Sequence, residues 1–161
     1  MTRHVKTICL ALALSLPLVA CGHTPDETPE VTRALATPLY PNETPELRQL
    51  IVKYADTYEV PVPLVQRLVV RESTHRPEAR NGPYYGLLQI LPATARSMGF
   101  AGKPSDLLDA ETNLKYAVKY LRGAWLLADG SYDTAVKWYA SGYYYEAKRR
   151  GMLVETGLRP G

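Results

Sequence analysis

This sequence has few cysteines and little excess charge. Its 161 residues include two cysteines, and the formal net charge is +3. Cys9 lies in a segment that we expect to be cleaved, so Cys21 would have no partner for a disulfide. The small charge gives no electrostatic support to nucleic-acid binding, which depends on many Lys and Arg contacts with phosphates. The length suits one domain of ordinary size with a core of its own.

The chain also lacks an apolar run long enough to cross a membrane as a helix. Residues 8–20 are apolar except for Ser15 and Pro17, and they follow the basic residues Arg3 and Lys6. A membrane-spanning helix needs about 20 apolar residues. The shorter run, with its basic start, has the layout of a secretory signal peptide.

The apolar run ends in Leu18-Val19-Ala20-Cys21, which resembles the lipobox of bacterial lipoproteins. In that class, cleavage leaves the cysteine as a lipidated N-terminus. We therefore expect residues 1–20 to be a lipoprotein signal peptide and Cys21 to carry a lipid that anchors the protein to a membrane. The alternative is an ordinary signal peptide followed by an incidental cysteine.

Residues 21–44 are rich in proline, threonine and acidic residues. Such a composition cannot bury a core and is typical of a semi-extended tether. At ~3 Å per residue, the segment would hold a domain on the order of 70 Å from its anchor. The expected organisation is a signal peptide at 1–20, a tether at 21–44 and a folded domain at 45–161.

The folded domain is helical by pattern. Apolar residues recur at helical spacing in four segments, residues 45–59, 63–73, 110–130 and 132–150. Pro92 opens a further short helix that Gly99 ends, and Gly142 interrupts or bends the last segment. The sequence has no useful stretch of alternating polarity and no internal repeat. We therefore expect an all-α fold of about five to seven helices, with at most a small hairpin within residues 74–86.

Glu72 occupies a position where the second of these helices should carry another leucine. It follows Val65 by seven residues and Leu68 by four, so it continues their apolar stripe. Carboxylates are rarely buried without a reason. This position makes Glu72 the first candidate for a functional residue.

Five ordered blocks around Glu72 point to a family. "RESTHRPEARNGPYYGLLQILPATA", then "LLDAETNLKYAVKYL" and "AVKWYASG", resemble the catalytic domain of the bacterial soluble lytic transglycosylases, which are related to goose-type lysozyme. The resemblance covers about residues 45 to 145. It implies a lysozyme-like fold and cleavage of peptidoglycan glycan strands, and it implies no cofactor.

The resemblance also implies roles for single residues. Glu72 and Ser73 stand for the family's catalytic Glu-Ser pair, Gln89 closes its Gly-Leu-Met-Gln block, and Tyr139 stands for its tyrosine near the acid. Tyrosines in the loop are suited to stack on sugar rings. The expected substrate-binding residues are therefore Ser73, Tyr84, Tyr85, Gln89 and Tyr139. The alternatives are that Gln89 is a satisfied loop amide and that Tyr139 only packs in the core.

Three features depart from the family pattern. The loop between Glu72 and Gln89 is one residue shorter, His75 stands where an aromatic residue is usual, and Ala140 replaces an asparagine. The loss of the asparagine puts one polar substrate contact in doubt but does not touch the acid. His75 has no second ligand at a useful spacing, so we expect no metal.

Glycosidic cleavage needs a donor that is protonated near neutral pH. Apolar surroundings raise the pKa of a carboxyl from about 4.3 and thus suit Glu72 to this task. The family route has Glu72 protonate the leaving oxygen and then accept the proton of the muramic C6 hydroxyl, which forms a 1,6-anhydro end. Many glycosidases add a second carboxylate. Glu78, Asp106, Asp109 and Glu111 are available for this role, but none belongs to the matched catalytic blocks.

Two other functions stay open from the sequence. A hydrolytic muramidase would use water in place of the C6 hydroxyl, and a non-catalytic lipoprotein would only bind peptidoglycan. In each case we expect a monomer that is lipid-anchored, faces the periplasm and contacts glycan strands. Gly22 after the cysteine favours the outer membrane over the inner one.

Overall fold

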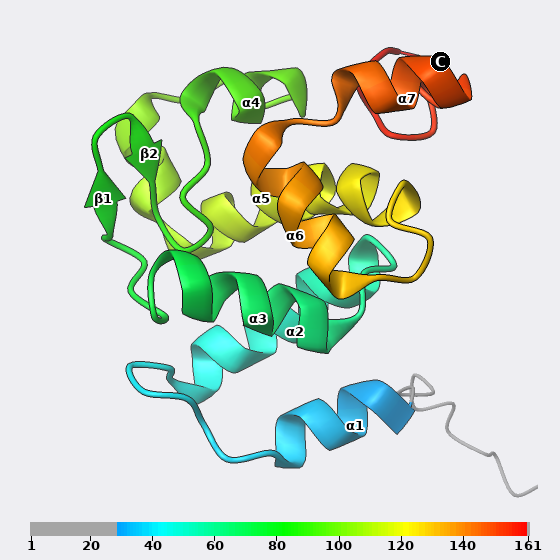
Figure 1. Ribbon diagram of the computed structural model, residues 1–161. Helices are drawn as coiled ribbons and strands as arrows, with labels where there is room; N and C mark the ends of the chain where they lie inside the picture. Colours follow the sequence, from blue (N-terminus) through cyan, green and yellow to red (C-terminus); the bar gives the residue numbers. More distant parts are fainter. Residues whose placement is uncertain (1–28, 161) are drawn as a thin grey trace, which may run out of the picture.

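The computed structural model describes residues 29–160. The expected signal peptide and Cys21 lie outside the described residues. The helices are α1 (Pro29–Ala36), α2 (Pro45–Thr57), α3 (Val62–Glu72), α4 (Pro92–Ser97), the 3₁₀ helix η1 (Pro104–Leu108), α5 (Ala110–Leu126), α6 (Tyr132–Ser141) and α7 (Tyr144–Arg150). The strands β1 (Arg80–Asn81) and β2 (Tyr84–Tyr85) form one antiparallel hairpin. The expected all-α fold with a small hairpin is confirmed (Figure 1).

Capping side chains account for where the main helices begin. The Thr44 hydroxyl accepts a hydrogen bond from the Leu47 amide at 3.2 Å, and the Ser131 hydroxyl accepts one from the Thr134 amide at 3.2 Å. Each such cap contributes about 1 kcal/mol. The expected break near Gly142 is also present, because α6 ends there and Gly142 has φ 78°.

The long helix α5 lies at the centre of the packing. It contacts α2, α4, α6 and η1, and its buried face carries Leu114, Ala117, Val118, Leu121 and Ala124. Gly123 on this helix allows a close approach, because a Cβ there would lie 2.3 Å from the Tyr143 hydroxyl oxygen. That hydroxyl donates to the Tyr120 carbonyl at 2.9 Å and so ties the start of α7 to α5.

Residues 29–44 pack on the domain, and the extended tether expected for them is wrong. The Arg48 guanidinium donates to the backbone carbonyls of Thr37 and Pro38 at 3.1 and 3.2 Å. The Glu30 carboxylate accepts from the Val62 amide at 2.6 Å. Composition alone missed this packing because it depends on contacts with distant residues of the domain, both these polar ones and the apolar packing of Val31 and Ala34 against the core.

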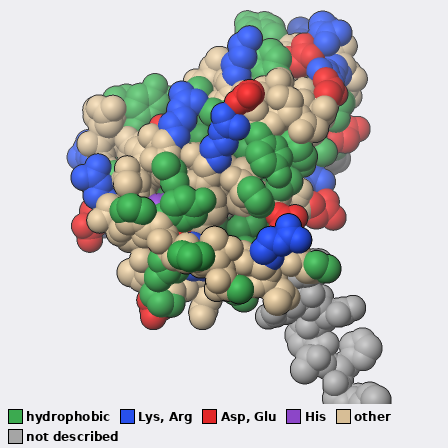
Figure 2. Space-filling model, turned by 60° about the horizontal axis from the view of Figure 1, so that its bottom comes forward, with side chains coloured by type: hydrophobic (Ala, Val, Ile, Leu, Met, Phe, Trp, Pro, Cys, Tyr) green, Lys and Arg blue, Asp and Glu red, His purple; other side chains and the backbone are tan. Residues whose placement is uncertain are grey.

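Figure 2 looks onto the side of the molecule that carries α1 and the segment after it. Leu35, Leu39 and Tyr40 are exposed apolar residues of this region. Within residues 29–160, no helix combines the length and the apolar character needed to span a bilayer.

Candidate active site

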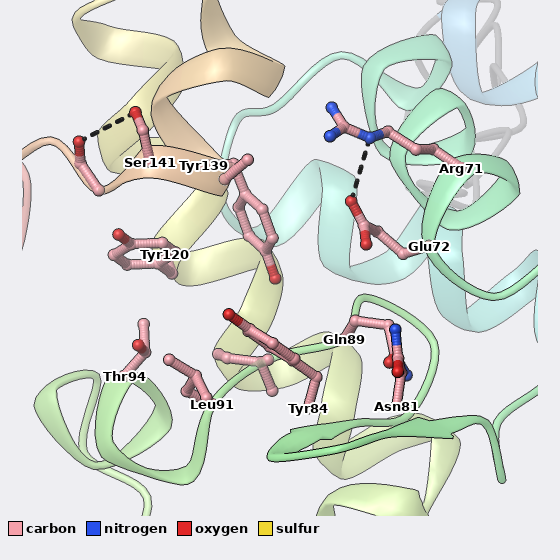
Figure 3. A pocket seen from close by; sticks show the side chains of 13 residues that line it. Arg71, Glu72, Asn81, Tyr84, Gln89, Leu91, Thr94, Tyr120, Tyr139 and Ser141 are labelled. Atoms are coloured by element: carbon pink, nitrogen blue, oxygen red, sulfur yellow. Dashed lines mark hydrogen bonds and ion pairs between the residues drawn. The ribbon is translucent and has the colours of Figure 1, made fainter.

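Two adjoining pockets form a groove across the domain, and Glu72 lies where they meet. The first has a volume of about 520 Å³ and the second about 620 Å³. Both are lined by Glu72, Asn81 and Gln89. The first continues past the end of α6 and the start of α4, as Figure 3 shows. The second continues along the loop that follows α3.

Glu72 is the last residue of α3, and its side chain is 22% exposed. Burial raises the pKa of its carboxyl, and the Arg71 guanidinium partly opposes that rise. The Arg71 Nε atom lies 3.3 Å from Glu72 Oε1, but the Arg71 side chain is 52% exposed, so solvent screens the pair. The negative end of the α3 dipole also disfavours the carboxylate. Glu72 is thus suited to keep its proton.

The helix face that leads to Glu72 is apolar, as its spacing predicts. Val65, Leu68 and Val69 are each fully buried. They fix one side of α3 against the core, so the next position on the same stripe emerges at the groove. The stripe therefore explains both the burial of Glu72 and its direction.

Gln89 supports the loop on which it lies. Its side-chain amide donates to the Ala79 carbonyl at 3.0 Å and to the Gly86 carbonyl at 2.9 Å. Both amide hydrogens are therefore used within the loop. This agrees with the alternative given from the sequence, that Gln89 is a satisfied loop amide. Because Gln89 lines both pockets, its oxygen is the atom that remains for a hydrogen bond from substrate.

Asn113, which the sequence analysis did not identify, supports the loop through hydrogen bonds to backbone groups. Its Oδ1 accepts from the Leu88 amide at 3.0 Å, and its Nδ2 donates to the Tyr85 and Leu107 carbonyls at 2.9 and 2.8 Å. A Cβ at Gly86 would lie 2.3 Å from Asn113 Nδ2, so only glycine fits beside this amide. A signal was present, because Asn113 is a polar residue four positions before Ala117 on the apolar face of α5.

Tyr139 reaches the groove from α6 and is nearly buried. Burial raises the pKa of its phenol well above the ordinary value, and the charge of Glu72 adds to that rise. Its hydroxyl donates to the Leu88 carbonyl at 2.9 Å. The single phenolic proton is thus committed to the loop, and only the oxygen is left to accept a bond from a protonated Glu72.

Tyr120 from α5 contributes a second phenol that the sequence reading missed. Its ring meets the Tyr139 ring edge-on at 5.3 Å between centroids, and burial raises its pKa to about 12. Both phenols therefore stay neutral across the physiological range. The other residues that line the first pocket and that sequence reasoning did not single out are Arg71, Asn81, Ile90, Leu91, Thr94 and Ser141.

The structure brings together some of the expected substrate-binding residues and not others. Tyr84, Gln89 and Tyr139 line the groove with Glu72. The Ser73 side chain is buried, and its hydroxyl donates to the Val69 carbonyl at 3.3 Å. The Tyr85 ring lies 4.5 Å from the Arg80 guanidinium, and neither Ser73 nor Tyr85 lines either pocket. For these two, the expectation of substrate contact finds no support.

Of the candidate second carboxylates, only Glu78 lies at the groove, in the second pocket. Asp106 accepts from the Lys103 amide at 2.9 Å and Asp109 from the Thr112 amide at 2.8 Å, so both cap helices. Glu111 pairs with Lys53 at 2.6 Å. Among residues 29–160 there is no cluster of His, Cys, Asp and Glu that could hold a metal ion.

The end of α6 forms one wall of the first pocket. Ala140 lines that wall and offers no polar group, and the neighbouring Ser141 hydroxyl donates back to the Lys137 carbonyl at 2.9 Å. The polar contact that the missing asparagine would have made is therefore not replaced by Ser141 in this arrangement.

A family model described as the transglycosylase SLT domain matches residues 49–150. The matched region runs from within α2 to the end of α7. It contains every residue that lines the two pockets except Asn42. No solved structure matches the chain.

Proposed function

The chain belongs to the transglycosylase SLT domain family, whose activity is lytic transglycosylation of peptidoglycan, and we propose that Glu72 carries out that reaction here. The bond cleaved would be the β-1,4 link between N-acetylmuramic acid and N-acetylglucosamine. One observation carries the proposal: a partly buried carboxyl with a raised pKa lies at the middle of a groove that is open on both sides.

In the first step, protonated Glu72 donates its proton to the glycosidic oxygen. The bond between that oxygen and C1 of the muramic residue breaks, and the N-acetylglucosamine end leaves as an alcohol. The positive charge that develops at C1 is stabilised by the substrate's own acetamido group. The raised pKa of Glu72 supports this step because the acid must still hold its proton when substrate arrives.

In the second step, the Glu72 carboxylate accepts the proton of the muramic C6 hydroxyl. The oxygen of that hydroxyl forms a bond to C1, which gives a 1,6-anhydro end and returns Glu72 to its protonated form. No water is consumed. One carboxyl performs both proton transfers, which agrees with a groove whose first pocket has Glu72 as its sole carboxylate within residues 29–160.

The shape of the groove supports a polymeric substrate. The two pockets lie on either side of Glu72 and together have the size of a ligand site rather than of a surface depression. A sugar in each pocket would place the scissile bond at the carboxyl. Tyr84 is 41% exposed at the first pocket and offers an aromatic face to one of these sugars.

The N-terminal sequence supports a proposal for the location of the protein. We propose that Cys21 is lipidated and holds the domain at the periplasmic face of a membrane, with the outer membrane favoured. Because residues 29–44 pack on the domain, the reach is set by residues 21–28, which span at most about 28 Å. The enzyme would therefore work on glycan strands close to its own membrane, as a monomer.

Glu78 in the second pocket favours one alternative, a hydrolytic muramidase with two carboxylates. The two reactions differ in their products, because an anhydro end is lighter than a reducing end by one water. Purified sacculi digested with the domain should release anhydro ends, as identified by mass spectrometry. Reducing ends in their place would establish hydrolysis and overturn the transglycosylase proposal.

A non-catalytic lipoprotein that only binds peptidoglycan is the other alternative, and the apolar Ala140 at the groove wall favours it. Such a protein would pellet with sacculi and release nothing. The same digestion therefore separates all three functions. A partly buried glutamate with a raised pKa is of no use to a module that only binds, which is why catalysis is preferred.

A further inference from the structure

The turn that follows Glu72 has an unusual backbone. Thr74 and His75 are consecutive residues with positive φ angles, 52° and 59°. Left-handed conformations are uncommon outside glycine, and a β-branched residue such as threonine is especially disfavoured there. Such a turn persists only where its surroundings determine it fully. The contacts around this turn must therefore supply that constraint.

The segment before α2 holds this turn through its backbone. Asn42 Nδ2 donates to the Thr74 carbonyl at 3.0 Å, across a sequence separation of 32 residues. Asn42 itself has φ 65°, a conformation that asparagine tolerates better than most residues. One side chain from the N-terminal segment thus fixes the orientation of the peptide group two residues after Glu72.

The same segment encloses the side chain of His75, which is 1% exposed. The His75 ring stacks on Tyr40 with centroids 5.1 Å apart. Its Nε2 lies 2.7 Å from Gln66 Oε1, and Gln66 Nε2 donates to Glu43 at 2.7 Å. Because the amide nitrogen of Gln66 is engaged with Glu43, its oxygen faces His75, and the imidazole donates from Nε2.

Glu43 is in turn held by Arg48. The guanidinium donates to both carboxylate oxygens at 2.6 Å, and the Tyr40 amide donates to Glu43 at 2.9 Å. The chain of contacts therefore runs from Arg48 through Glu43 and Gln66 to His75. Every link in this chain has a side chain with little or no exposure to solvent.

These contacts accommodate His75 at a position where the family has an aromatic residue. An apolar ring could pack there without partners, whereas imidazole needs a hydrogen bond. Gln66 Oε1 accepts that bond, and Glu43 holds the Gln66 amide in the orientation that makes it possible. Tyr40, Asn42, Glu43 and Arg48 all precede the region that the family model matches. His75 and residues 40–48 therefore form one set of contacts that the family pattern does not include.

This set of contacts lies beside the groove. Asn42 and His75 line the second pocket together with Glu72. The turn that they hold begins at Ser73, the residue next to the acid. A change in the turn would therefore alter both the wall of that pocket and the direction in which the Glu72 carboxyl points.

We propose that residues 40–48 are a positioning clamp for the catalytic acid. By fixing the left-handed turn at Thr74 and His75, they set the orientation of Glu72 and keep the second pocket open. This inference rests on the proposed function for its effect on turnover. The clamp residues themselves take no part in proton transfer.

The variant Asn42→Gly tests the clamp with the least damage to the fold. Glycine keeps the left-handed backbone at this position and removes only the bond to Thr74. The matched control is Asp129→Gly. Asp129 is also a non-glycine residue with positive φ, 50°, and its exposed carboxylate accepts hydrogen bonds from Arg150 at 2.8 and 3.0 Å. Neither residue lines the two pockets.

We expect Asn42→Gly to lower kcat on glycan strands about tenfold, because a misdirected acid loses its alignment with the glycosidic oxygen. KM should change less than twofold, and the melting temperature should fall no more than in Asp129→Gly. The control should keep the wild-type kcat. A rise in KM alone would show that Asn42 only contacts substrate, and equal kcat in the two variants would show a purely structural role. Either result would overturn the clamp.

Asn42→Asp sharpens the test because it preserves the size of the side chain. Its ionised carboxylate accepts hydrogen bonds but cannot donate to the Thr74 carbonyl. We expect it to lose kcat as Asn42→Gly does. Full activity in Asn42→Asp would mean that bulk, and not the hydrogen bond, is what matters, and the proposal would fail.

A titration that needs no turnover separates the clamp from the proposed function. The carboxyl carbon of Glu72 can be followed by NMR as pH changes in wild type, Asn42→Gly and Asp129→Gly. A loosened turn should admit water to Glu72 and lower its pKa toward the ordinary value in Asn42→Gly alone. An identical titration in all three proteins would overturn the clamp, whereas a wild type that releases no anhydro ends would overturn only the proposed function.

Discussion

Glu43 and Glu72 differ both in their exposure to solvent and in the partners of their carboxyl groups. The Glu43 side chain is fully buried, whereas the Glu72 side chain is 22% exposed. Burial raises the pKa of Glu43, but hydrogen bonds from Arg48, Gln66 and the Tyr40 amide outweigh it and leave that pKa lowered. Burial also raises the pKa of Glu72, and only the exposed Arg71 opposes it. The hydrogen-bond partners of each carboxyl, and not the extent of its burial, therefore decide which of the two keeps its proton.

Because their pKa values shift in opposite directions, the ionised Glu43 carboxylate stabilises the fold and the ionised Glu72 carboxylate destabilises it. The lowered pKa of Glu43 adds stability that is present above the ordinary glutamate pKa and is lost as pH falls through the folded value. The raised pKa of Glu72 acts in the opposite sense. Its contribution is present at low pH and is lost as pH rises through the folded value.

The largest effect should come from Glu72→Gln. The amide keeps the shape of the side chain but cannot donate a proton to the glycosidic oxygen. We expect the release of anhydro ends from sacculi to fall by about 10³-fold or more, with binding to sacculi retained. Substantial turnover in this variant would end the single-acid mechanism.

Glu78→Gln is the matched control for that loss. Glu78 lines the second pocket, as Glu72 does, but plays no part in a mechanism with one carboxyl. We expect its turnover to stay within about threefold of wild type, since only a surface charge of the groove changes. A loss as large as that of Glu72→Gln would favour the muramidase with two carboxylates.

The next effect should be on stability and should come from Arg48→Met. This change leaves Glu43 buried without its cation, and removing one member of a buried pair costs about 3–5 kcal/mol. Chemical denaturation at neutral pH should show this loss. Arg149→Met provides the comparison, because Arg149 is 68% exposed in its pair with Glu146 and should cost less than about 1 kcal/mol. Similar losses in the two variants would contradict a structural role for Glu43.

A smaller effect should separate the two glutamates by the pH dependence of stability. As pH rises through the raised pKa of Glu72, the wild-type carboxyl becomes ionised in surroundings that disfavour its charge, so Glu72→Gln should raise the melting temperature by about 2 °C above that pKa. The gain should shrink toward zero as pH falls and the wild-type carboxyl takes up its proton. A gain that stays constant with pH would show that charge is not its cause.

The smallest effect should come from Arg71→Gln. The Arg71 guanidinium lowers the pKa of Glu72 against the larger effect of burial. Its removal should therefore move the alkaline fall of activity to slightly higher pH. Because Arg71 is half exposed, the shift should disappear at high salt, where exposed charges are screened. A shift to lower pH would have the wrong sign and would contradict this reading of the site.

The sequence predicted the helices and the acid because both depend on local patterns. Helical spacing places α2 and α5 with little dependence on the rest of the fold, and in the structure Thr44 and Asp109 cap their first turns. The apolar stripe of α3 places Glu72 by the same logic. Patterns of this kind need only the neighbouring residues to be known.

Other parts of the site depend on contacts between distant segments. Tyr84 and Tyr85 are adjacent in one strand, where neighbouring side chains point to opposite faces, so the sequence could not tell which one lines the groove. Arg48 reads as a surface residue of α2, yet it is 3% exposed and binds the segment before it. Its backbone partners lie in residues 29–44, and only the packing of that segment on the domain brings them to Arg48.

The pKa values of Glu43 and Glu72, measured in one carbon-detected NMR titration of the wild-type domain, would compare the two carboxyls directly. We expect Glu72 to titrate above the ordinary glutamate value of 4.5 and Glu43 below it. If Glu72 titrated at or below that value, it would hold no proton near neutral pH, and its assignment as the acid would be contradicted.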